Sequence, residues 1–295
     1  MISRALPSGM PRRLLTAALA AGVLALLVAA PSALADAFTP ESGGSPNAED
    51  IDTLYKITLY IGIVIFLIVE GTLVWSLVRF RARRGGPEAA QIRGNTPLEL
   101  GWTVGAALIL VVLTVVTFLY LEDIENPPPS GPNGLRASQA QFASIDQPEP
   151  PTSGGPVLRV KVVGQQYLWR YDYGDSDDLF SYHEMVVPVN TTVVLQITAT
   201  DVIHSWWIPK LGGKADAVPG HVNETWFKIP GRLAGTTFRG QCAELCGANH
   251  ADMRAEVRAV TPDEFQDWAD GQREAIQASR EDLAEQRRQR EEEDQ

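Results

Sequence analysis

The chemistry of this chain is concentrated in one stretch, QCAELCGANHADM, which runs from Gln241 to Met253. The stretch carries both cysteines of the chain, Cys242 and Cys246, followed by an imidazole at His250 and a thioether at Met253. Soft thiolate and thioether ligands together with imidazole select copper over hard cations. The stretch therefore predicts a copper-binding loop, and such a loop needs a rigid scaffold to hold it.

A second imidazole, His204, lies upstream in the segment DVIHSWW, residues 201–207. Two cysteines four residues apart on one loop can place both sulfurs between two metal ions, with one imidazole capping each copper and the thioether adding a weak axial contact. A blue site with one copper needs a single cysteine, so the second cysteine favours a two-copper centre. Zinc is the nearest competitor, but structural zinc takes only Cys and His in a closed tetrahedron. A disulfide between the two cysteines would leave the nearby imidazole and thioether unexplained.

The sequence around these ligands predicts an all-β scaffold over residues 157–262. Short runs rich in Val, Ile, Thr and aromatic residues alternate with turns marked by Pro and Gly. Closely spaced strands of this kind are typical of a β-sandwich or barrel of ~100 residues. The predicted strands are Val157–Val163, Tyr167–Tyr173, Thr191–Thr200, Thr225–Ile229 and Arg254–Val260.

The first 35 residues have the pattern of a secretory signal peptide. Arg12 and Arg13 precede an apolar run over residues 14–30, and the A-x-A sequence of residues 33–35 marks a cleavage site. The apolar run is long, so an uncleaved membrane anchor is the alternative. We predict that residues 1–35 are removed and that residues 36–53 form an extracytoplasmic N-terminal segment.

Two further apolar stretches predict transmembrane helices over residues 54–78 and 98–121. Each is long enough to cross a ~30 Å hydrocarbon core, and the second is apolar on all sides, unlike an amphipathic helix of a soluble protein. The loop between them, residues 79–97, holds five arginines and one glutamate. The positive-inside rule places this basic loop in the cytoplasm and everything after residue 121 outside.

The two predicted helices carry two acidic residues that need an explanation. Carboxylates within membrane segments are functional candidates by default. Glu70 lies well inside the first helix, and we interpret it as a residue packed against a partner subunit. Glu99 lies at the cytoplasmic end of the second helix, where the residues alone indicate a boundary position.

Two segments flank the β domain and differ from it in composition. Residues 122–156 are rich in Pro, Gly, Ser and Gln, which predicts a linker. Residues 263–295 are mostly polar and predict a charged, helical, solvated tail. The chain of 295 residues has a net charge of −11, which argues against nucleic acid as a partner.

The loop Cys242-x-Glu244-x-Cys246-Gly247-Ala248-Asn249-His250-x-x-Met253 resembles the CuA loop of cytochrome c oxidase subunit II. The segment from His204 to Gly220 is similar to that family's region around its first histidine ligand, and the resemblance extends over roughly residues 50–260. It implies a cupredoxin-like sandwich on a two-helix transmembrane hairpin. It also implies electron transfer from cytochrome c to the haem and copper centre of subunit I, where oxygen is reduced to water and protons are translocated.

The resemblance also assigns roles to single residues. Cys242 and Cys246 would bridge two coppers, and His204, His250 and Met253 would complete the ligand shell. Glu244 would give its carbonyl oxygen to copper and its carboxylate to Mg²⁺ at the interface with subunit I.

Three further roles concern electrons and protons. Glu99 matches the family's carboxylate at the entrance of a proton path, which favours a functional role over a boundary position. Tyr167 stands where many members carry the tryptophan thought to receive the electron from cytochrome c, and Trp169 fits the neighbouring aromatic position.

The expected partners are subunit I, other oxidase subunits and a separate cytochrome c, because the chain contains no C-x-x-C-H motif for covalent haem. The expected location is a bacterial cell membrane with the copper domain on the extracytoplasmic side. Three rival functions fit less well. A quinol-oxidase subunit II lacks the copper ligands, a copper carrier needs an open and exchangeable site, and a nitrous-oxide reductase needs a large additional domain.

Overall fold

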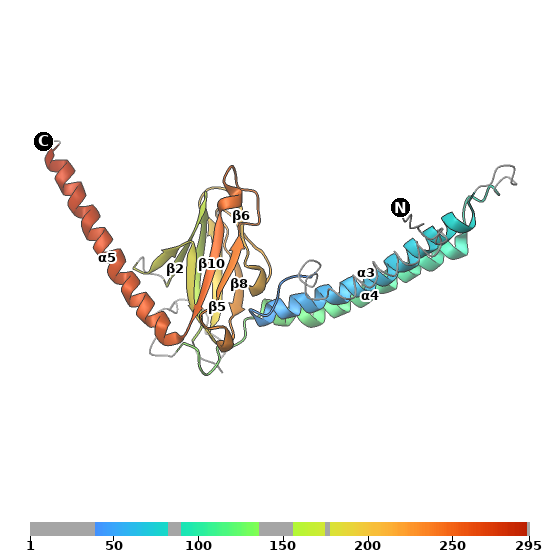
Figure 1. Ribbon diagram of the computed structural model, residues 1–295, viewed down its shortest axis with the longest axis horizontal. Coiled ribbons are helices and arrows are strands. Elements are labelled where there is room, and N and C mark those ends of the chain that lie inside the picture. Colours follow the sequence, from blue (N-terminus) through green and yellow to red (C-terminus); the bar gives the residue numbers. More distant parts are fainter. Residues whose placement is uncertain (1–38, 82–89, 136–155, 175–177, 294–295) are drawn as a thin grey trace, which may run out of the picture. The chain divides into compact units, whose positions relative to one another are not determined.

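A computed structural model describes residues 39–81, 90–135, 156–174 and 178–293. The predicted signal peptide, part of the basic loop and most of the predicted linker lie outside these ranges. Within them, two long helices come first, a β-sandwich follows, and a third long helix ends the described chain (Figure 1).

The first two helices, α3 (Pro46–Arg79) and α4 (Thr96–Glu125), pack against each other (Figure 1). Both are long and apolar enough to cross a membrane, and most of their large apolar side chains are exposed. They extend beyond the predicted spans of 54–78 and 98–121, because a helix continues into polar flanks wherever its backbone groups stay paired. The hydrophobic pattern therefore located the spans but not the helix ends.

The N-terminus of α4 is capped by two neighbouring side chains. Asn95 accepts a hydrogen bond from the amide of Leu98 at 3.3 Å, and Glu99 Oε1 accepts one from the amide of Asn95 at 2.9 Å. These contacts satisfy amides that have no partner inside the helix. Glu99 thus has a structural role at the position predicted to be a boundary or a proton entrance.

The β-sandwich consists of two main sheets and a small third one. The larger sheet has the order β3-β2-β1-β5-β8, the second has the order β4-β10-β9, and β6 pairs with β7. Strands β1 and β5 run parallel, as do β4 and β10. The strands are β1 (Leu158–Gln165), β2 (Leu168–Tyr173), β3 (Phe180–Tyr182), β4 (Glu184–Pro188), β5 (Thr192–Ala199), β6 (His204–Trp206), β7 (Ala215–Ala217), β8 (Asn223–Lys228), β9 (Thr237–Gln241) and β10 (Arg254–Val260).

One large hydrophobic cluster fills the sandwich, and Val157, Val194 and Trp226 form a second, small one. Val160 and Leu195 are directly paired on neighbouring strands of the larger sheet, and both are fully buried with Met185 and Val257 from the second sheet. Burial alternates along β1, as a strand with one core-facing side requires. The predicted sandwich is therefore confirmed. Strands β9 and β10, which flank the loop of residues 242–253, contribute buried side chains to its core.

The predicted strands match β1, β2, β5, β8 and β10, whereas β3, β4, β6, β7 and β9 were not predicted. Strands β3, β6 and β7 have three residues each, which is too short for a periodic pattern. All three residues of β6 are buried, so this strand shows no alternation at all. Such strands are recognisable only once their partners are in place.

The start of the predicted linker differs from an unpacked chain. Residues 122–125 belong to α4, and Ser130 and Leu135 are buried against the sandwich. Ser130 accepts a hydrogen bond from the amide of Thr192, and the amide of Leu135 donates to Thr191 Oγ1. Hydrogen bonds to Thr191 and Thr192, at the start of β5, hold this part of the segment against the sandwich, and composition does not reveal such contacts.

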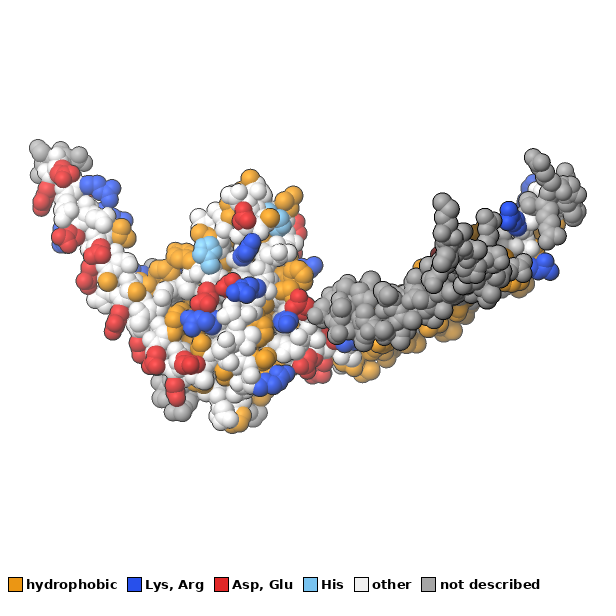
Figure 2. All heavy atoms as spheres, in the orientation of Figure 1, with side chains coloured by type: hydrophobic (Ala, Val, Ile, Leu, Met, Phe, Trp, Pro, Cys, Tyr) orange, Lys and Arg blue, Asp and Glu red, His pale blue; other side chains and the backbone are white. Residues whose placement is uncertain are grey.

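The third helix, α5 (Pro262–Glu293), confirms the predicted helical tail but is only partly solvated. Phe265, Ala269 and Ile276 are buried, and Phe265 lies beside Trp268 and Tyr173 in an aromatic cluster. Charged side chains cover the second half of the helix (Figure 2). The first turns of α5 are therefore part of the domain core, because one apolar stripe meets the sandwich.

We expect Phe265→Ala to lower the free energy of unfolding of the β domain by about 3–5 kcal/mol, the usual cost of truncating a buried aromatic side chain. Leu283 is 51% exposed on the same helix, so Leu283→Ala is the matched control and should change stability by less than about 0.5 kcal/mol. Denaturant unfolding of the full chain in detergent, followed by tryptophan fluorescence, measures both. Equal small effects would show that α5 does not contribute to the core.

Candidate metal centre

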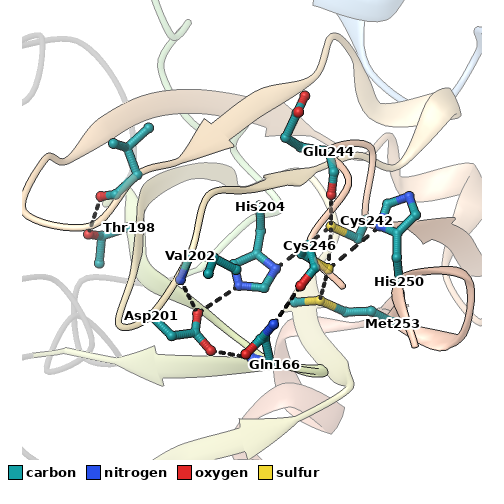
Figure 3. A network of polar contacts seen from close by, with 11 residues as sticks. Gln166, Thr198, Asp201, Val202, His204, Cys242, Glu244, Cys246, His250 and Met253 are labelled. Carbon is teal, nitrogen blue, oxygen red and sulfur yellow. Dashed lines mark hydrogen bonds and ion pairs between the residues drawn. The ribbon is translucent and has the colours of Figure 1, made fainter. Parts of the chain in front are cut away.

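The loop between β9 and β10 contains every predicted ligand except His204 (Figure 3). Its base is closed by a hydrogen bond from the amide of Cys242 to the carbonyl of Met253 at 2.8 Å. The amide of Ala243 donates to the carbonyl of Ser205 at 2.9 Å, which fastens the loop to β6. This pairing brings His204, which is distant in sequence, beside the two cysteines.

The side-chain ligand atoms converge on Cys246. Its Sγ lies 3.9 Å from Cys242 Sγ, 3.6 Å from His250 Nδ1 and 3.8 Å from Met253 Sδ (Figure 3). Cys242 Sγ in turn lies 3.9 Å from His204 Nδ1. The ligand atoms of His204, Cys242 and Cys246 all lie within 4.8 Å of one another, which matches the predicted soft-metal site.

The two thiols are free and buried, with exposed fractions of 2% for Cys242 and 4% for Cys246. Burial and the neighbouring Cys242 raise the pKa of Cys246 to about 11. The metal-free thiol is therefore protonated at neutral pH, and a bound cation must displace this proton. Two sulfurs, two imidazole nitrogens and a thioether around a buried point fit copper and suit no hard cation.

Asp201 orients the buried imidazole of His204. Its Oδ1 lies 2.9 Å from His204 Nε2 and accepts the amide of Val202, while Oδ2 accepts the amide of Gln166 at 2.7 Å. Desolvation raises the pKa of Asp201, but these hydrogen bonds outweigh it and keep the pKa below its ordinary value. An ionised Asp201 favours a proton on Nε2, which leaves Nδ1 free to face Cys242 as a ligand.

Sequence reasoning did not identify Asp201 or Gln166 as parts of the site. The Asp-x-x-His spacing of residues 201–204 was the available signal for the first. Gln166 lies between β1 and β2 and gives no local indication that it approaches the ligand loop. Its amide side chain donates to the carbonyl of Cys246 at 2.6 Å.

The two predicted aromatic residues take different positions. Trp169 is fully buried, and its ring meets the His204 ring edge-on at 5.9 Å between centroids. Tyr167 is half-buried, and its hydroxyl accepts the amide of Ala248 at 3.1 Å. Trp169 therefore cannot touch a docked protein directly, whereas Tyr167, in the turn between β1 and β2, contacts the ligand loop through its hydroxyl.

The remaining predicted site residues lie apart from this cluster or at its edge. The carbonyl oxygen of Glu244 lies 3.2 Å from Cys242 Sγ, and Glu244 as a whole is exposed. Among the described residues, no group of carboxylates or imidazoles gathers at Glu244 to hold a second cation. Glu99 and the half-buried Glu70 lie on the transmembrane helices.

Comparisons with known proteins agree with this architecture. Residues 179–260 match the family "Cytochrome C oxidase subunit II, periplasmic domain", and residues 33–119 match "Cytochrome C oxidase subunit II, transmembrane domain". The matched periplasmic region begins at β3 and leaves out β1 and β2, which the structure places in the same sandwich.

Individual relatives cover most of the chain. A Rickettsia prowazekii protein named "Probable cytochrome c oxidase subunit 2" is 34% identical over 255 residues, which is 80% of this chain and 72% of that protein. The cytochrome c oxidase subunit 2 of Thermostichus vulcanus is 32% identical over 278 residues, covering 85% and 83% of the two chains. The crystallised periplasmic domain of the Bradyrhizobium japonicum subunit II is 37% identical, covers 40% of this chain and 94% of that one, and has a TM-score of 0.37. The chain belongs to the cytochrome c oxidase subunit II family.

Proposed function

We propose that this chain takes up electrons from a separate cytochrome c at a two-copper CuA centre and delivers them to the haem and copper centre of subunit I. As a cytochrome c oxidase subunit II, the chain is part of an oxidoreductase complex, and its two apolar helices place it in a membrane. The periplasmic family match supports an extracytoplasmic copper domain. The observation that carries the proposal is the convergence of two buried thiols, two imidazoles and a thioether.

Each ligand has a distinct position around the site. Cys242 and Cys246 lie side by side and would together hold the copper pair, while His204 and His250 approach opposite sulfurs. Met253 and the carbonyl of Glu244 would be weaker ligands beside them. Bound copper would provide a one-electron carrier, and the strands on both sides of the loop would keep its ligands nearly fixed when an electron arrives. A magnesium ion at the Glu244 carboxylate stays a prediction that needs ligands from subunit I.

Copper content tests this function. The full chain, purified in detergent and loaded with copper, should hold two coppers per chain, because paired thiolates can bridge two ions. Mass spectrometry counts the metal, and electron spin resonance should show one electron shared by two copper nuclei. A single copper with a one-nucleus signal would indicate a blue-copper site or a carrier.

Electron uptake is expected to involve Tyr167 as the surface contact, with Trp169 behind it beside His204. We expect Tyr167→Ala to slow copper reduction at saturating cytochrome c, because an aromatic surface that packs against the donor haem edge is lost. Tyr167→Phe keeps the ring and is the matched control, with a rate near that of the wild type. Stopped-flow reduction measures both, and a wild-type rate in Tyr167→Ala would place electron uptake at another residue.

A further inference from the structure

The turn between β1 and β2 touches the ligand loop at a short segment, residues 246–248. Gln166 Nε2 donates to the carbonyl of Cys246 at 2.6 Å, and the hydroxyl of Tyr167 accepts the amide of Ala248 at 3.1 Å. Gly247 lies between these two contacts. A Cβ at Gly247 would lie 2.5 Å from Tyr167 Oη and 2.9 Å from Gln166 Nε2, so the turn packs closely against the loop.

This contact matters because the loop is intrinsically free to bend at Gly247. Gly247 has a φ of +129°, a conformation that glycine adopts without steric cost but does not hold by itself. Rotation at this position would move Cys246, whose sulfur lies beside three other ligands. The hydrogen bond that Gln166 donates to the Cys246 carbonyl opposes that rotation.

Gln166 also reaches the other half of the site through its backbone. Its amide donates to Asp201 Oδ2 at 2.7 Å, and the second oxygen of Asp201 holds His204 (Figure 3). Gln166 therefore contacts both Asp201, whose carboxylate orients the His204 imidazole, and the carbonyl of Cys246. His204 comes from β6 and Cys246 from the β9–β10 loop, so Gln166 links these two segments in addition to the hydrogen bond from Ala243 to Ser205.

We propose that Gln166 is a positioning residue that holds the Cys246 side of the ligand loop in register with His204, and that its side-chain amide is the group that does so. The expected effect on copper binding rests on the proposed two-copper function. The hydrogen bond from Gln166 to the Cys246 carbonyl, by contrast, restrains the loop before any metal binds. Residues that orient metal ligands from outside the ligand shell commonly change metal affinity 10- to 100-fold when removed.

The first test uses the metal-free full chain in detergent. We expect Gln166→Met to raise the rate at which iodoacetamide alkylates Cys246 by about fivefold, because the closed loop loses one hydrogen bond of ordinary strength. Gln166→Glu has nearly the shape of glutamine but cannot donate from an ionised carboxylate, and it should show at least the same increase. Peptide mass spectrometry separates modification of Cys246 from that of Cys242.

Gln165→Met is the matched control. Gln165 is the last residue of β1, is exposed, and makes none of the contacts that tie Gln166 to the loop. Its alkylation rate should equal that of the wild type. Circular dichroism of all variants should be unchanged, since the backbone hydrogen bond from Gln166 to Asp201 is retained.

The second test uses the copper-loaded chain. Gln166→Met should release copper to a chelator about 10 to 100 times faster than the wild type, and the visible absorption should shift because the sulfur of Cys246 changes its position. Unchanged alkylation and unchanged copper release would overturn the proposal. If the wild type binds no copper pair, the proposed function fails, whereas faster alkylation of Cys246 in Gln166→Met would still show that Gln166 positions the ligand loop.

Discussion

Cys246→Ser should abolish the two-nucleus spin signal and reduce the copper content from two ions to at most one per chain. The sulfur of Cys246 lies 3.6–3.9 Å from three other side-chain ligand atoms, those of Cys242, His250 and Met253, so its loss removes a central ligand. A serine hydroxyl is a hard, protonated group at neutral pH and cannot replace a bridging thiolate. Electron spin resonance and metal counting on the full chain in detergent measure the loss.

Met253→Leu is the matched control for this experiment. Met253 is fully buried and close to leucine in volume, so the replacement removes the thioether with little change in packing. Because an axial thioether is a weak ligand, we expect two coppers and a shared electron to remain, with a shifted reduction potential. Retention of the two-nucleus signal in Cys246→Ser would contradict the bridging role of the thiolate.

Glu99→Gln should slow steady-state oxygen reduction by the assembled oxidase at least ~10-fold, in line with the loss of a group that transfers protons. Reduction of the copper site by cytochrome c should stay unchanged, because Glu99 lies at the end of α4 preceded by the basic loop, whereas the ligands lie in the β domain. Oxygen uptake and stopped-flow copper reduction on one preparation separate the two steps.

The structure makes glutamine a clean replacement at this position. Glu99 Oε1 accepts the amide of Asn95, and a glutamine carbonyl can accept the same hydrogen bond, so the helix cap is kept while the titratable proton is lost. Glu122→Gln, near the opposite end of α4, is the control and should leave turnover unchanged. If Glu99→Gln has wild-type turnover, the carboxylate is a helix cap and not a proton entrance.

Much of the candidate site was predictable because its ligands are chemically unusual and close in sequence. Two thiols, an imidazole and a thioether in residues 242–253 have few purposes besides binding a soft metal. The transmembrane helices were predictable for a similar reason, since a long apolar stretch has few alternatives to a membrane. The short strand β6, by contrast, has no pattern of its own, although it carries His204.

The sequence by itself predicted a soft-metal site, the two apolar helices of the described residues and the all-β class of the domain, since each depends on residue types and on spacing along the chain. Only the tertiary structure decided which distant groups support the site. Asp201 and Gln166 act through hydrogen bonds to His204 and Cys246, and Phe265 becomes a core residue by meeting Tyr173. Such contacts join segments far apart in sequence, and a polar or aromatic side chain carries no mark of its partner until the strands between them have packed.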